Sequence, residues 1–114
     1  MIDHPALSDE DRTPPKEVAD AARRGLDLRE EHGRGGTEVG VRRAEQLGAR
    51  ETVSDRDIKS MCSYFARHAV DRHGRNWADP VKPSAGYIAW QLWGGDAGRA
   101  WINGLRARLR EAQG

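Results

Sequence analysis

The apolar positions of the chain repeat with the spacing of α-helices. The clearest run follows Ser54 and extends to about residue 70, with apolar residues three and four positions apart, so that they share one helical face. These residues are Ile58, Met61, Cys62, Phe65, Ala66 and Ala69. Ser54 is a typical N-cap residue, and the carboxylates of Asp55 and Asp57 favour the positive end of the helix dipole. The pattern predicts a helix that begins at residue 55.

Four further segments show the same periodicity between recognisable start and stop signals. We expect helices at about 14–32, 38–47, 85–93 and 97–112. The expected N-caps are Thr13, Thr37, Ser84 and Asp96, and the glycines expected to end helices are Gly33, Gly48, Gly94 and Gly95. The first of these segments has a stripe of mostly small apolar residues, so we expect that helix to pack closely or weakly.

No segment shows the alternation of a β-strand. Residues 71–83 contain two prolines and a glycine, which favour an irregular loop. Residues 1–12 are polar and acidic, and we expect a flexible N-terminal arm there. The predicted fold class is therefore all-α, a single compact domain at 13–112 of four or five short helices joined by glycine turns.

Composition narrows the class of protein. The 114 residues are 37% hydrophobic and 32% charged, and they contain no apolar run of the ~20 residues that span a bilayer. The N-terminus lacks the basic and apolar regions of a signal peptide, so we expect a protein that is not secreted. The single cysteine, Cys62, excludes an internal disulfide framework and a multi-cysteine zinc site.

Charge and aromatic residues are distributed unevenly. Residues 1–57 carry 14 acidic and 10 basic side chains, whereas residues 58–114 carry 4 acidic and 9 basic ones. All seven aromatic residues fall between Tyr64 and Trp101. The excess of 16 arginines over 3 lysines favours bidentate contacts to phosphate or carboxylate, although a GC-rich genome produces the same bias. The C-terminal half thus combines the expected core with a basic surface.

Three runs of sequence, taken together, resemble a known family. They are residues 33–44 (GRGGTEVGVRRA), 63–71 (SYFARHAVD) and 83–101 (PSAGYIAWQLWGGDAGRAW). In this order they resemble a small helical domain of unknown function that recurs in tailed-phage and prophage proteins, some of them linked to head formation. The resemblance covers about residues 16–105. It implies a phage or mobile-element origin and an all-helical domain, and it carries over no catalytic residue.

A basic, aromatic surface is the first candidate site. Its predicted contact residues are Arg67, Arg72, Arg75, Trp77, Lys82, Arg99, Arg106, Arg108 and Arg110. If they shared one face, they would bind phosphates in a salt-dependent manner with little sequence specificity. Of the tryptophans, we expect Trp90 or Trp93 and Trp101 to be buried and Trp77 to be exposed. The helices on either side of residues 48–53 resemble a helix-turn-helix, but Asp55 and Asp57 would repel DNA there.

Two other groups of residues suggest chemistry. The turn Arg34-Gly35-Gly36-Thr37 precedes a helix and is a candidate anion-binding turn, with a tight interhelical turn as the alternative. His68, Asp71 and His73 suggest a metal site or a general base, although a hydrogen-bonded histidine at a helix end fits the same residues. We expect no catalytic residue, metal or cofactor, and we expect Cys62 to be an inert apolar residue.

Three hypotheses on function follow. The first is a non-enzymatic phage-type binding module that contacts nucleic acid through its C-terminal half. The second is a virion or assembly component that binds another phage protein. The third is a small metal-dependent or His/Asp hydrolase. The first two place the protein in the host cytoplasm or in the phage particle, and none of the three involves a membrane.

Overall fold

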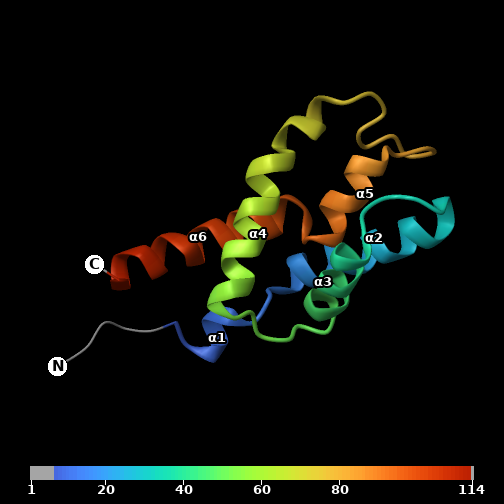
Figure 1. Cartoon of the computed structure of the whole chain (residues 1–114). Helices are drawn as coiled ribbons and strands as arrows, with labels where there is room; N and C mark the ends of the chain where they lie inside the picture. The colour runs from blue at the N-terminus through green and yellow to red at the C-terminus, as the bar shows by residue number, and fades with distance from the viewer. Residues whose placement is uncertain (1–6, 114) are drawn as a thin grey trace.

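The computed structural model describes residues 7–113, and its regular elements are helices throughout (Figure 1). They are α1 (Asp9–Arg12), α2 (Lys16–His32), α3 (Glu38–Gly48), α4 (Asp55–His68), the 3₁₀ helix η1 (Ala69–His73), α5 (Ala85–Leu92) and α6 (Gly95–Gln113). Residues 7–113 contain no β-strand. The predicted all-α class is confirmed, and no helix in this range is long and apolar enough to cross a bilayer.

Local capping explains most of the helix boundaries. Ser54 and Asp57 form a reciprocal capping box at the start of α4, and Thr37 and Ser84 cap α3 and α5 as expected. Gly33 ends α2 in the left-handed conformation. Two expected caps are wrong. Thr13 is not the cap of α2, because it ends α1 and the cap position of α2 belongs to Pro15.

Asp96 is the second cap that the structure corrects. It lies inside the first turn of α6, which already begins at Gly95. Its carboxylate accepts a hydrogen bond from the indole Nε1 of Trp90 at 2.9 Å. Gly94 and Gly95 have φ angles of 112° and 66°, so the chain turns from α5 into α6 without a loop. Asp96, which was expected to cap a helix, therefore stabilises the corner between α5 and α6 through its hydrogen bond with Trp90.

The N-terminal arm also differs from the expectation. Leu7 is buried in the core, and Ser8 and Asp11 form a capping box around the short helix α1. Arg12 donates hydrogen bonds to the Val53 carbonyl at 3.0 Å and to Asp55 at 2.7 Å. These contacts, 41 and 43 residues apart in sequence, fix the segment from residue 7 onward. Residues 1–6 of the predicted arm lie outside the described residues.

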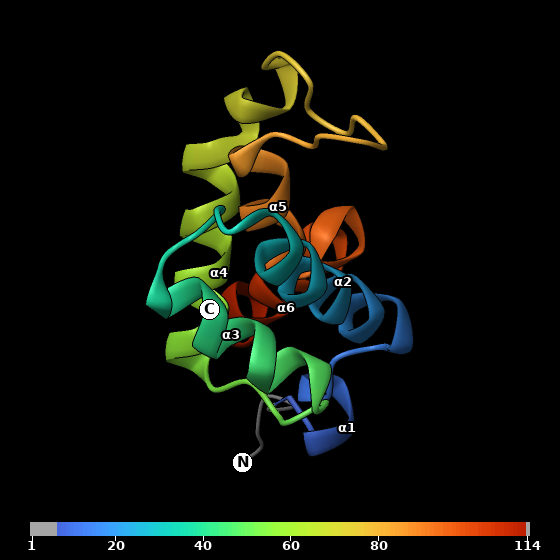
Figure 2. The ribbon, with the colours of Figure 1, turned by 90° about the vertical axis from the view of Figure 1, so that its right-hand side faces the viewer.

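Helix α2 lies at the centre of the fold, in contact with α3, α5 and α6 (Figure 2). Its small residues allow this approach. A Cβ atom at Gly25 would lie 2.6 Å from the backbone nitrogen of Leu92, so α2 and α5 meet main chain to main chain. Gly94 lies against Val18 and Gly95 against Ala21, which seats the α5–α6 corner on the same helix. The small-residue stripe therefore packs closely.

Aromatic rings fill the space between α4 and α5. Phe65 and Trp90 are fully buried and meet edge to face at a centroid distance of 4.8 Å. Tyr64 stacks on Trp93 at 4.5 Å. These contacts hold α5 against one side of α4, and α6 then crosses α4 on another side. The arrangement leaves a groove between α4 and α6.

The backbone contact at Gly25 gives a stability prediction. Gly25→Ala introduces a methyl group that only a shift of α2 or α5 can accommodate, and we expect a loss of about 1–3 kcal/mol in the free energy of unfolding. Gly104→Ala is the matched control, because nothing lies within 4 Å of its added Cβ. That helical substitution should stabilise the protein by about 0.5–1 kcal/mol. Urea unfolding measures both, and equal tolerance of the two changes would refute the close crossing.

Candidate nucleic-acid interface

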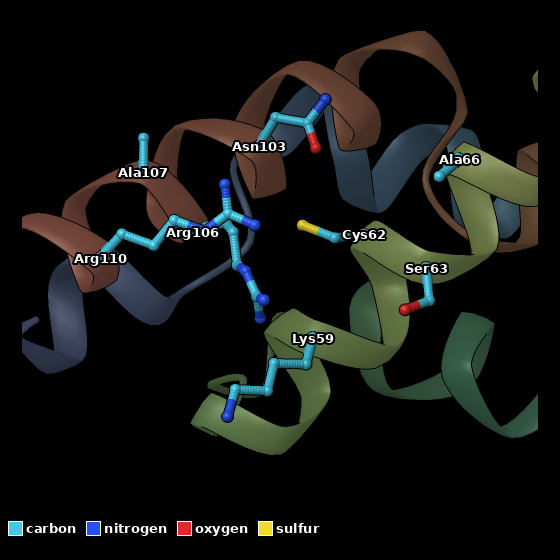
Figure 3. A pocket seen from close by; sticks show the side chains of 8 residues that line it. All are labelled: Lys59, Cys62, Ser63, Ala66, Asn103, Arg106, Ala107 and Arg110. Carbon is cyan, nitrogen blue, oxygen red and sulfur yellow. The ribbon is translucent and has the colours of Figure 1, made fainter. Parts of the chain in front are cut away.

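The groove between α4 and α6 is a concavity of about 400 Å³. Residues one helical turn apart on each helix form its walls (Figure 3). They are Lys59, Cys62, Ser63 and Ala66 from α4 and Asn103, Arg106, Ala107 and Arg110 from α6. Residues four positions apart lie on the same face of a helix, so the periodicity of α6 places Arg106 and Arg110 side by side along the groove.

The groove is cationic. Lys59 faces Arg106 and Arg110 in its lining, and no carboxylate of the described part of the chain lines it. Within the described range 7–113, none of these three cations takes part in an ion pair. Arg106 is partly buried, whereas Lys59 and Arg110 are exposed. Three like charges thus line one concavity without an ion-pair partner among residues 7–113.

The carboxylates near the groove are engaged elsewhere. Asp55 pairs with Arg12 at 2.7 Å, and Asp57 pairs with Arg43 at 2.9 Å. Burial opposes ionisation of Asp57, but hydrogen bonds from the Ser54 backbone and from Arg43 outweigh it and lower its pKa to about 2. These pairs correct one argument from the sequence. The two acidic residues at the start of α4 are neutralised by arginines, so they do not present an unbalanced negative charge to DNA.

The pKa of the Cys62 thiol depends on the charges that line the groove. Its Sγ points from α4 towards α6 and donates a hydrogen bond to the Ile102 carbonyl at 3.6 Å (Figure 3). Burial raises the pKa of this thiol, while the charges of Arg106 and Arg110 act in the opposite direction. The thiol is therefore mostly protonated at neutral pH, which matches an inert side chain in the wall of the groove.

The structure does not bring the predicted basic residues together on one face. Arg106 and Arg110 line the groove, but Arg108 lies about 200° around α6 from Arg106 and pairs with Asp11 at 3.1 Å. That contact lowers the pKa of Asp11 to about 2. Lys59, which the sequence analysis did not single out, joins Arg106 and Arg110 instead. In the sequence, the only indication of this role for Lys59 is its position beside the apolar stripe of the helix expected at 55–70.

Two more of the predicted cations pack on an aromatic ring. The guanidinium carbons of Arg72 and Arg99 lie 5.7 and 5.8 Å from the ring centroid of Trp90, and Arg72 is 3.7 Å from Asp96. Both side chains thus cover the buried tryptophan at the α5–α6 corner. Their charges interact with Trp90 and, for Arg72, with Asp96, and these contacts lie away from the groove.

Three more of the predicted contact residues, Arg75, Trp77 and Lys82, lie in the loop after η1, beyond the C-terminal end of α4 (Figure 1). Arg75 and Lys82 are exposed there. Trp77 differs from the expectation of an exposed ring, because it is partly buried and meets the edges of Tyr87 at 5.3 Å and Trp90 at 5.7 Å. Trp90 and Trp93 are buried, and Trp101 is partly buried.

A second hollow, of about 570 Å³, lies on the other side of α4, between α3 and α5. Arg67, His68 and Asp71 line it, and Nδ1 of His68 is 3.0 Å from the Asp71 carboxylate. This pair closes the end of α4, as the structural alternative for the histidine predicted. His73 is exposed and is not part of the hollow. No three His, Cys, Asp or Glu side chains among residues 7–113 are close enough to hold a metal.

The glycine-rich turn at 34–37 packs against α5. Arg34 donates a hydrogen bond to the Pro83 carbonyl at 2.7 Å, and the hydroxyl of Thr37 accepts from the Gly40 backbone. A Cβ atom at Gly35 would lie 2.6 Å from Ile88, and one at Gly36 would lie 2.6 Å from a methyl group of Leu92. Close packing accounts for these glycines, as the tight-turn alternative predicts.

Comparison with known proteins adds no assignment. No family model matches the chain, and no curated protein or solved structure matches it significantly. The resemblance to a phage domain therefore stays a prediction.

The geometry of the groove predicts the reactivity of its thiol. Replacing Arg106 and Arg110 by glutamine removes two charges that favour the thiolate, so the pKa of Cys62 should rise further. Alkylation by iodoacetamide near pH 9 should then become slower, and it is specific because Cys62 is the only cysteine. Arg75→Gln is the matched control and should leave the rate unchanged. An unchanged rate in the double variant would mean that the two arginines do not face the thiol.

Proposed function

We propose that this protein is a non-enzymatic helical binding module of the phage type, which contacts the phosphate backbone of nucleic acid through the α4–α6 groove. One observation carries the proposal. Lys59, Arg106 and Arg110 line the groove together, and neither a carboxylate in its walls nor an ion pair within residues 7–113 balances them.

The balance of charges in the groove favours a polyanion. Three cations along one concavity repel one another, and a polyanion placed between the helices replaces that repulsion by attraction. Each phosphate neutralised by a cation also releases condensed counterions, which favours binding at low salt. Ser63 and Asn103 add uncharged hydrogen-bonding groups to the two walls. The chemistry of the whole lining therefore suits phosphate groups.

The same lining supports binding rather than catalysis. Among residues 7–113, no histidine and no carboxylate that would act as a general base lines the groove. The thiol of Cys62 has a raised pKa and is therefore poorly activated, and the hydroxyl of Ser63 has no such base beside it in the lining. The His68–Asp71 pair faces the other hollow, where burial raises the pKa of the neighbouring Tyr64.

If the protein is of phage origin, it would meet the viral genome in the host cytoplasm or in the phage particle. The alternative partner is an acidic surface of a phage structural protein. Pull-down of the protein from infected cells, with and without nuclease treatment, distinguishes the two. Loss of all partners after nuclease supports the proposal, and a phage protein that stays bound after nuclease supports the alternative.

Salt dependence tests the groove directly. With three phosphate contacts, the logarithm of the affinity for duplex DNA should fall with the logarithm of salt concentration with a slope of about −2.7. A tenfold rise in salt then weakens binding by roughly 500-fold. Lys59→Gln, at an exposed position, should weaken binding and reduce the slope to about −1.8. Fluorescence anisotropy with a labelled duplex measures both quantities.

The control removes the same charge elsewhere. Arg75→Gln changes an exposed arginine in the loop beyond α4 and should leave the slope at about −2.7. Circular dichroism establishes that each variant keeps its helix content. The proposal is wrong if no binding occurs at low salt, or if Arg75→Gln reduces the slope as much as Lys59→Gln does.

A further inference from the structure

We infer, on the basis of the proposed function, that the groove accepts the backbone of a nucleic-acid duplex in preference to a single strand and does not read the base sequence. The inference rests on three features of the molecule. They are the absence of aromatic rings from the groove, the concave shape of the cationic surface and the rigidity of its two walls.

The groove offers no platform for base stacking. Proteins that bind single strands without sequence preference combine a basic track with aromatic side chains on which successive bases stack. None of the seven aromatic residues of the chain lines the α4–α6 groove. A single strand would therefore gain phosphate contacts there and leave its bases without a partner.

The aromatic rings are engaged elsewhere. Trp93 stacks on Tyr64 at a centroid distance of 4.5 Å, and the guanidinium carbon of Arg43 lies 5.3 Å from the Trp93 centroid. Trp90 is 1% exposed. Trp101 projects from α6 about half a turn away from Arg110, so it lies on the opposite side of that helix from the groove. Packing thus keeps these indole rings away from anything bound between α4 and α6.

The concave shape of the groove determines which part of a nucleic-acid duplex fits into it. Base edges lie at the floor of the DNA grooves, and a protein reads them with an element that protrudes, such as a helix in the major groove. Here Lys59, Arg106 and Arg110 line a recess instead. The part of a duplex that fits a recess is the ridge formed by one sugar-phosphate strand. Contacts to that ridge position a protein and carry no sequence information.

Rigidity favours the duplex as well. The wall formed by α4 extends from Lys59 to Ala66, which corresponds to a helical segment of about 12 Å and to roughly three to four base pairs. A duplex presents its phosphates in a fixed row along this length. A single strand has to be ordered before it follows the same row, and that loss of conformational freedom reduces its affinity.

Competition between two forms of the same DNA tests the inference. The probes are a labelled 20-base-pair duplex of mixed sequence, one of its strands alone, and a second duplex of unrelated sequence. We expect the two duplexes to bind within about threefold of each other and the single strand to bind at least tenfold more weakly. Single-strand binding as tight as duplex binding, or a tenfold difference between the duplexes, overturns the inference.

A gain-of-function variant provides the converse test. Ser63 is exposed at the wall of the groove, so Ser63→Trp places a stacking surface where the chain has none. This change should raise the affinity for the single strand about tenfold or more relative to the duplex. Ser63→Leu, apolar but without a ring, is the control and should not. Equal effects of the two variants would show that base stacking does not cause the change in affinity, and this would contradict the inference.

The outcomes separate the inference from the function on which it rests. Binding of single strand and duplex with equal affinity, weakened by Lys59→Gln in both cases, leaves the proposed function intact and overturns the duplex preference. Binding of neither form at low salt overturns both. Duplex binding that Lys59→Gln does not weaken places the contact outside the groove and overturns both as well.

Discussion

The main-chain contact between α2 and α5 at Gly25 is the constraint on which the rest of the structure depends. It brings the two backbones so close that no side chain fits between them at this point. The α5–α6 corner then rests on the same face of α2, with Gly94 against Val18 and Gly95 against Ala21. The start of α6 is thereby seated on α2. From this corner α6 runs across α4, with which it is in contact, and the groove lies between the two helices.

Four arginines of the C-terminal half are divided between the aromatic cluster and the groove. Arg72 and Arg99 cover Trp90 at one end of α6, where a cation over a ring favours the folded state. Arg106 and Arg110, two and three turns further along, have no ring to cover and face Lys59. The same residue type thus contributes to stability at one end of the helix and to an open cationic surface at the other.

The sequence predicts what is determined locally. The cap at Ser54, the stop at Gly33 and the helix periodicities depend on residues within one turn, and the structure confirms them. What the sequence does not predict depends on distant contacts. The order of residues 7–12 comes from Arg12 binding Val53 and Asp55, and the brace at Asp96 comes from Trp90. Likewise, Lys59 joins the groove only because α6 crosses α4.

The open charge of the groove follows from how the fold distributes its carboxylates. Asp55, Asp57 and Asp11 all lie on helices near the groove, yet each is bound by an arginine from another helix. These pairs connect α1 to α4, α3 to α4 and α1 to α6, so they use the available acids to fasten helices together. An acidic residue in place of Ser63 or Asn103 would balance the groove in the same way. The chain has uncharged residues at both positions, which leaves the three cations available to an external anion.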